Sequence, residues 1–195
     1  MTPGTPAMLF GCSPVGPAEL ATTLLTRVGE RAREFQKTMS EYRAWTKAVL
    51  AVLSDEGKHL GLEVYCHGAP DVGEWLLDCV WWAKNGERGA GMCLACESEW
   101  SDRPLEVSWD FQKLLCVKAP LKVVIYSGGP APKHGSGIRK QLESDLLGYG
   151  FHVRGEEYLF VSLDVGGGYA HRVAITADGR MEKLEWELVE VKNRE

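Results

Sequence analysis

The hydrophobic and polar positions along this chain predict alternating helices and strands. From Pro17 to about Ser54, hydrophobic residues recur every three or four positions, which indicates a helical segment. Gly29 is a position at which this segment could divide into two helices. Two further helices are predicted over 105–117 and 137–147, and Pro120 ends the first of them. Strands are predicted at 60–65, 74–82, 91–96, 121–126, 158–163, 170–174 and 181–191.

The order of these elements predicts an α/β sandwich with a central mixed sheet flanked by helices. Residues 17–195 have the length of a single domain, with a core at about 40–150 and extra antiparallel strands at about 155–195. Residues 1–16 are rich in proline and glycine and lack the basic and long apolar regions of a signal peptide. We therefore expect them to form a flexible tail.

Composition is that of a soluble globular protein, with 45% hydrophobic and 25% charged residues among 195. The 22 basic and 27 acidic residues give a net charge of −5, so nucleic-acid binding would require a local basic face. Lys133, Arg139 and Lys140 are candidates for such a face. No apolar run approaches the roughly 18–20 residues of a membrane span. A cytoplasmic location is expected.

The six cysteines are mostly inside apolar runs, which favours free core thiols over a disulfide framework. Cys93 and Cys96 form a CxxC pair. A zinc site would normally have a second pair at similar spacing, and the chain has none. In a regular strand the two side chains would also face opposite sides of the sheet, so core packing is favoured.

Carboxylates at the ends of apolar strands are the candidate chemistry of this chain. Asp78 lies in the run 74–82, and Glu97 and Glu99 end the next run. Side chains alternate along a strand, so Glu97 and Glu99 share a face, with Ser98 opposite. The polar turn at 84–89 predicts a hairpin that brings Asp78 beside them. Glu63, on the preceding strand, and Glu74 are further candidates.

Such a group of carboxylates would suit a hard divalent cation. Mg²⁺ or Mn²⁺ binds through two or three carboxylate oxygens and keeps several waters. The ion activates water and stabilises the charge that develops on a phosphate, which is the chemistry of phosphodiester hydrolysis.

The spacing of these acids resembles the PD-(D/E)XK, or restriction-endonuclease-like, nuclease superfamily. There an acid on one strand is followed by acid-X-lysine on the next, so Asp78 and Glu97 correspond to the two acids. Glu99 stands at the lysine position, as in a Glu-X-Glu variant with an additional upstream glutamate, for which Glu63 is the candidate. The resemblance covers about residues 40–150 and implies a restriction-endonuclease-like fold.

The lysine of the family motif could instead come from the following helix. Residues 110–115 resemble a segment of uncharacterised bacterial proteins with this nuclease core, in which an acid-Ser-acid-Trp strand precedes such a helix and then a Lys-Val-Val-Ile strand. Lys113 would orient water or stabilise the phosphate, and an ordinary solvated helix lysine is the alternative.

The resemblance implies a Mg²⁺- or Mn²⁺-dependent endonuclease that acts on nucleic acid, DNA in the first instance. Asp78, Glu97 and Glu63 would hold the metal, and Glu99 would be a further ligand or general base. A homodimer would be expected of an enzyme that cuts both strands. The alternatives are a catalytically inactive scaffold or binding module that kept the fold, and a hydrolase of small phosphorylated molecules, for which no nucleotide-binding motif is present.

Overall fold

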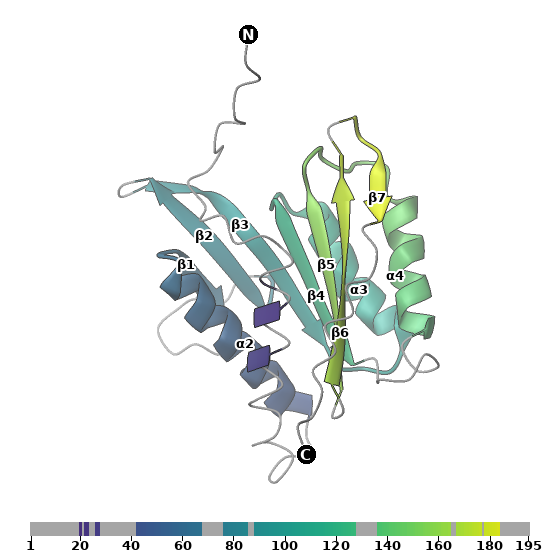
Figure 1. Cartoon of the computed structure of the whole chain (residues 1–195), viewed down its shortest axis with the longest axis horizontal. Coiled ribbons are helices and arrows are strands. Elements are labelled where there is room, and N and C mark those ends of the chain that lie inside the picture. The colour runs from purple at the N-terminus through teal and green to yellow at the C-terminus, as the bar shows by residue number, and fades with distance from the viewer. Residues whose placement is uncertain are drawn as a thin grey trace.

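A mixed seven-stranded sheet organises the structure, with helices on both faces (Figure 1). The computed structural model describes residues 20, 22–23, 26–27, 42–67, 76–85, 88–127, 136–164, 167–176 and 178–183. The helices are α2 (Tyr42–His59), α3 (Pro104–Cys116) and α4 (Ser136–Gly148). The strands are β1 (Glu63–Cys66), β2 (Cys79–Asn85), β3 (Arg88–Glu99), β4 (Leu121–Ser127), β5 (Glu157–Asp164), β6 (Gly167–Ile175) and β7 (Met181–Lys183).

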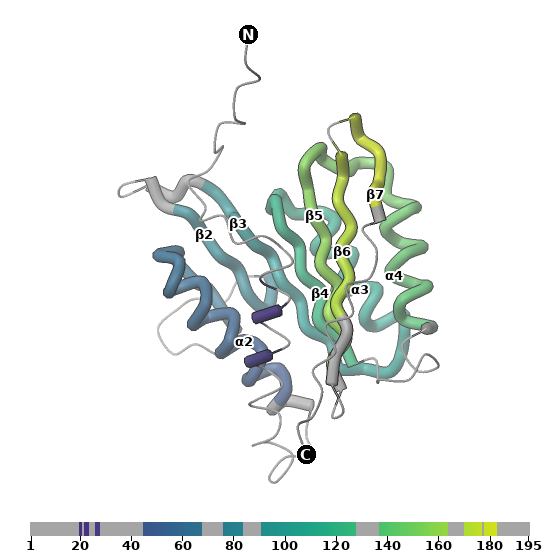
Figure 2. The backbone as a smooth tube through the Cα atoms, in the orientation of Figure 1, coloured from purple at the N-terminus to yellow at the C-terminus, as the bar shows by residue number. Residues whose placement is uncertain are grey.

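The strands lie in the sheet in the same order as in the chain, from β1 to β7. The first three are antiparallel to one another, β3, β4 and β5 are parallel, and β6 and β7 are antiparallel again. Figure 2 shows β3, β4, β5 and β6 following one another across the sheet. The three parallel strands end at one edge of the sheet, which places the ends of β3 and β4 together.

The two parallel connections explain the placement of the helices. Crossovers between parallel strands are right-handed in nearly all proteins, and both connections step across the sheet in the same direction. Consequently α3 and α4 cover the same face, where Phe111 packs against Tyr158 and Phe160 with ring centroids 6.1 and 5.3 Å apart. The opposite face packs against α2 through a second apolar cluster that includes Val49, Leu53 and residues of β1–β5.

The predicted α/β class and mixed sheet are confirmed. The helices expected at 105–117 and 137–147 match α3 and α4 to within one residue at each end. Several boundaries differ. α2 continues to His59, and β2 begins at Cys79, with residues 76–78 in a bend. β1 begins later than expected, whereas β3 and β6 are longer than the predicted runs. Of the strand expected at 181–191, residues beyond 183 lie outside the described residues, as do residues 1–16. None of the helices in the described ranges is long and apolar enough to cross a membrane.

A bulge in β3 changes the expected facing of the two CxxC cysteines. Trp81 pairs with Leu94 and Trp82 with Met92, so Cys93 is an extra residue without a partner on β2. Both Cys93 and Cys96 therefore contribute to the core beneath α2. The opposite facing predicted from regular alternation is wrong. Cys96 is a free, buried thiol, in line with the sequence expectation, whereas Cys93 is disulfide-bonded.

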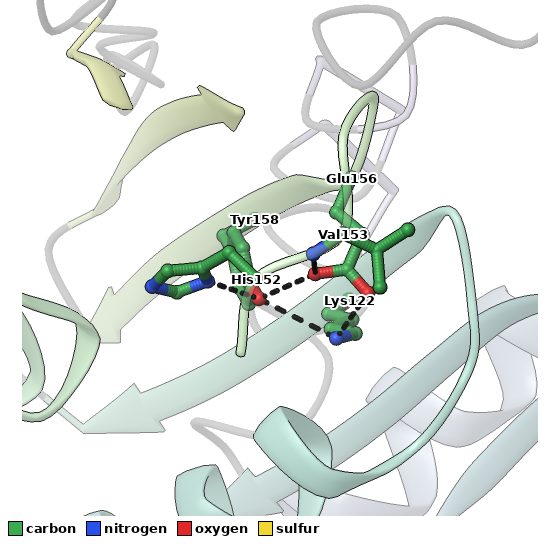
Figure 3. A network of polar contacts seen from close by, with 5 residues as sticks. All are labelled: Lys122, His152, Val153, Glu156 and Tyr158. Atoms are coloured by element: carbon green, nitrogen blue, oxygen red, sulfur yellow. Dashed lines mark hydrogen bonds and ion pairs between the residues drawn. The ribbon is translucent and has the colours of Figure 1, made fainter. Parts of the chain in front are cut away.

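A buried polar network joins β4, β5 and the turn after α4 (Figure 3). Lys122, which is 1% exposed, donates to Glu156 Oε1 at 2.8 Å. The hydroxyl of Tyr158 donates to Glu156 Oε2 at 2.9 Å, and the amide of Val153 donates to the same oxygen at 3.2 Å. The ring of His152 contacts the Tyr158 hydroxyl at 3.0 Å. These contacts satisfy an ion pair inside an otherwise apolar layer.

At Gly57, α2 packs closely against the sheet. A Cβ at this position would lie 2.6 Å from Val64 Cγ2 and 2.7 Å from Trp81 Nε1, which donates to the carbonyl of Leu53 at 3.1 Å. We expect Gly57→Ala to destabilise the protein by about 1–3 kcal/mol, because the helix must move away from the strand residues.

Gly148→Ala provides the matched control for this prediction. Gly148 ends α4, and a Cβ there would meet nothing within 4 Å. That variant should keep or slightly raise stability, because alanine has the higher helix propensity. Urea denaturation of both variants measures the difference. Equal stability of the two would show that Gly57 is not a packing requirement.

Candidate metal and nucleic-acid site

Asp78 and Glu97 lie opposite each other where β2 meets β3. Cys79 pairs with Cys96 in an antiparallel register, so the next positions outward are Asp78 on one strand and Glu97 on the other. Opposed residues in such a ladder have Cα atoms about 4.5–5.5 Å apart. The hairpin therefore brings the two acids together, as the sequence predicted.

The carboxylate of Asp78 is fixed by the neighbouring serine. Oδ2 accepts two hydrogen bonds from Ser98, one from the backbone amide at 2.8 Å and one from the hydroxyl at 2.9 Å. The carbonyl of Asp78 also accepts from the amide of His67 at 2.8 Å, which ties the bend to the strand end of β1. Both hydrogen bonds from Ser98 to the Asp78 carboxylate are accepted by the same oxygen, Oδ2. Sequence reasoning assigned Ser98 only to the opposite face, and its role as the anchor of Asp78 was missed.

Glu97 is a buried acid whose partner comes from α3. The residue is 2% exposed, and its Oε1 lies 2.7 Å from Nζ of Lys113. Oε1 accepts no well-aligned hydrogen bond from the described residues, so the contact with Lys113 is an ion pair. Burial raises the pKa of Glu97 to about 8, and the nearby Asp78 adds to this, against the opposing effect of Lys113. A cation at this carboxylate would favour its ionised form.

Lys113 is held between two carboxylates. Besides Glu97, its ammonium contacts Oδ1 of Asp110 at 2.8 Å, one turn earlier on α3. Burial lowers the pKa of Lys113, but the contacts with Asp110 and Glu97 outweigh this effect and raise it above its ordinary value. The lysine expected from the following helix is thus brought to the acids of the strand. Asp110 is the first residue of the segment 110–115, and its i, i+3 spacing from Lys113 is the signal that would have identified it.

Glu99 lies at the margin of this group. Its Oε1 accepts a hydrogen bond from the amide of Ser101 at 2.8 Å. Burial raises the pKa of Glu99, and Asp110 contributes through its proximity. Glu99 therefore belongs to the same acidic neighbourhood as Asp110. It has a local turn contact that Glu97 lacks.

The structure does not bring Glu63 to the site. Glu63 pairs with Trp82, whereas the site end of β1 is Cys66, which pairs with Cys79. Trp82 is four positions after Asp78 in the chain, which corresponds to roughly 13 Å along a strand. The phenol of Tyr65 donates to Glu63 Oε2 at 3.4 Å. The accessory acid predicted at this position is thus placed at the far end of the hairpin.

The basic candidates fall into two groups. Arg139 and Lys140 are exposed in the first turns of α4, which follows β4 and so begins near the edge where β3 and β4 end. Arg139 pairs with Glu143 at 3.1 Å. Lys133 lies outside the described residues, as does Glu74.

A cleft of about 1290 Å³ runs past one side of these acids. Asp78, Ser98 and Glu99 line it at the strand ends, together with Trp100. The opposite wall is α2, which contributes the exposed Lys47 and Lys58 among other residues. Glu97 does not line this cleft, because its carboxylate points toward α3. Asp78 and Glu99 therefore border the cleft from the end of the sheet, and Glu97 lies outside it.

The donors present fit a partly hydrated Mg²⁺ better than a metal held by protein alone. Within the described ranges, no three histidine, cysteine, aspartate or glutamate side chains gather closely enough to hold a metal ion. Mg²⁺ usually keeps several waters and binds through one or two carboxylates, and Asp78 and Glu97 provide two. The buried Oε1 of Glu97 without a well-aligned hydrogen bond is an oxygen of the kind such an ion would take.

Comparison of the chain with family models, with curated proteins and with solved structures finds no match.

Proposed function

We propose that this protein is a Mg²⁺- or Mn²⁺-dependent endonuclease with a restriction-endonuclease-like fold, acting on nucleic acid and first of all on DNA. The observation that carries the proposal is the 2.7 Å contact between Glu97 on β3 and Lys113 on α3, directly beside Asp78. Acid, acid and lysine converge from three separate elements. The carboxylate of Glu97 is buried at a strand end, and its partner Lys113 is half exposed, so the pair is open to a ligand from solvent on the lysine side.

In this proposal Asp78 and Glu97 hold the metal. Ser98 fixes one oxygen of Asp78 and so sets the orientation of the carboxylate. A bound Mg²⁺ would supply Lewis acidity toward a phosphate and would promote ionisation of water. Lys113 would place its positive charge near the phosphate oxygens, and Glu99 would accept a proton or contribute a further ligand.

Charge along the cleft accounts for how a polyanion would be received. Lys47 and Lys58 on α2 would meet phosphates on one wall, and Arg139 and Lys140 would meet them beyond the strand ends. The cleft also has acids besides the proposed ligands, namely Asp55, Asp102 and Glu106. The acids between them would repel nucleic acid until a cation neutralised them. Binding of nucleic acid should therefore depend on the divalent ion.

Cleavage assays test this proposal. Plasmid DNA, single-stranded DNA and RNA are incubated with the full chain and Mg²⁺ or Mn²⁺, alongside Asp78→Asn and Glu97→Ala. We expect the wild type to cut at least one substrate and both variants to lose cutting, because each variant removes a proposed metal ligand. Glu182→Gln, an exposed acid on β7, is the matched control and should cut like the wild type.

Metal binding distinguishes the proposed enzyme from a catalytically inactive scaffold. Calorimetry with Mn²⁺ should detect a site of millimolar affinity or better in the wild type and its loss in Asp78→Asn. If the wild type neither binds Mn²⁺ nor cuts any substrate, the enzyme proposal is wrong. The chain would then be a nuclease-fold scaffold in which Lys113 remains the partner of Glu97.

A further inference from the structure

The ammonium of Lys113 is shared between two acids from different elements. Nζ lies 2.7 Å from Glu97 Oε1 on β3 and 2.8 Å from Asp110 Oδ1 on its own helix. The side chain of Glu97 is 3% exposed and that of Asp110 is 23% exposed. One acid is thus fixed inside the sheet layer, whereas the other is at its margin, one helical turn from the lysine.

A metal ion and this ammonium would compete for the same oxygen. Mg²⁺ binds oxygen at about 2.0–2.1 Å, and a second cation 2.7 Å from that oxygen would be repelled by the ion. A metal that takes Oε1 of Glu97 would therefore displace Lys113 from this oxygen. The contact with Asp110 can remain, because both residues are on α3 at i and i+3.

We propose that Asp110 is a positioning residue that keeps Lys113 at the site after a metal has taken Glu97. This inference rests on the function proposed above. A free lysine side chain has a flexible four-carbon stem, and its 44% exposed position on α3 offers it solvent. Asp110 removes this freedom and leaves the ammonium next to the metal position, where a phosphate would meet it. Glu99, which neighbours Asp110, marks the outer limit of the same acidic group.

Kinetics of Asp110→Asn test the inference in the full chain. We expect kcat for DNA cleavage to fall 10- to 100-fold, with KM and the Mn²⁺ affinity each within threefold of wild type. Asp110→Glu should recover most of kcat, because it restores a carboxylate within reach. Adding Lys113→Met to Asp110→Asn should cause little further loss, because the two residues act as one unit. If the two substitutions lowered kcat independently, so that their effects multiplied in the double variant, the inference would be overturned. A tenfold weaker Mn²⁺ affinity in Asp110→Asn would also overturn it, because Asp110 would then be a metal ligand.

A measurement without catalysis keeps this inference separate from the proposed function. The ¹⁵N-labelled Nζ of Lys113 is followed by NMR in wild type and Asp110→Asn, with and without saturating Mg²⁺. We expect the signal to persist in the wild type with Mg²⁺ and to broaden beyond detection in Asp110→Asn, because the unheld ammonium exchanges with water. If the wild type cuts nothing but shows this pattern, the nuclease proposal fails and the positioning role stands. The same signal in both proteins, or its loss in both, overturns the positioning role.

Discussion

Lys122→Met is expected to destabilise the protein by about 3–5 kcal/mol at pH 7. The substitution leaves Glu156, which is 5% exposed, without the ammonium that now lies 2.8 Å from its Oε1. Tyr158 and Val153 still donate to Oε2, but neither carries a charge that offsets the buried carboxylate. A loss of this size is a large part of the total stability of an ordinary domain. Equilibrium urea denaturation measures it.

The double variant Lys122→Met/Glu156→Gln separates the charge from the packing. Glutamine keeps a carbonyl oxygen for the donors of the network and removes the buried charge (Figure 3). Most of the lost stability should therefore return, since an uncharged pair has no ionic desolvation cost. A single variant within about 0.5 kcal/mol of wild type would show that water reaches Glu156, and a double variant no better than the single would assign the loss to packing.

Glu97→Gln is expected to stabilise the metal-free protein at alkaline pH while it removes the proposed metal ligand. Burial raises the pKa of Glu97 to about 8 from an ordinary 4.5, so the folded protein holds this proton more tightly than the unfolded chain does. The free energy of unfolding must then fall as pH rises from about 4.5 to about 8, and it levels off above that. Glutamine has no proton to lose. The variant should exceed the wild type by roughly 2–4 kcal/mol at pH 9.

Urea denaturation in EDTA at pH 5 and pH 9 measures this difference. At pH 5 the two proteins should have similar stability, because Glu97 is largely protonated in the folded state. Saturating Mn²⁺ should reverse the order at pH 9, since the ion stabilises only the protein that binds it. An equal difference between variant and wild type at both pH values would contradict the raised pKa. Glu182→Gln, which removes an exposed acid, controls for the change in net charge.

The site could be predicted from sequence where local spacing determines it. Alternation along a strand and a polar turn between two apolar runs were sufficient to bring Asp78 and Glu97 together. The contact of Lys113 with Glu97 depends on how α3 packs on the sheet, and only the resemblance suggested it. Glu63 was misplaced because strand parity gives the face of a residue and not its position along the strand. The register of β1 and β2 decides that position.

The fold was predictable for the same reason. The prediction was wrong where the backbone is irregular. In α3 and α4, apolar residues recur at helical spacing. This pattern differs from the two-residue alternation or short apolar run that is typical of a strand. The bulge at Cys93 leaves no mark in the sequence, although it places both cysteines of the CxxC pair in one core. The sequence does not indicate the bend before Cys79 either, because the apolar run continues through it.

The order of the strands has a consequence for how the protein is made. Each strand pairs with the one that precedes it in the chain, so the sheet can be extended in step with synthesis and no strand must be inserted between two that are already paired. Short sequence separation between partners also favours rapid folding. The contacts of Asp78, Glu97, Asp110 and Lys113 lie between residues 78 and 113. The helix that carries Lys113 packs through Phe111 on Phe160 of β5, so the site is completed only after β5 has been made.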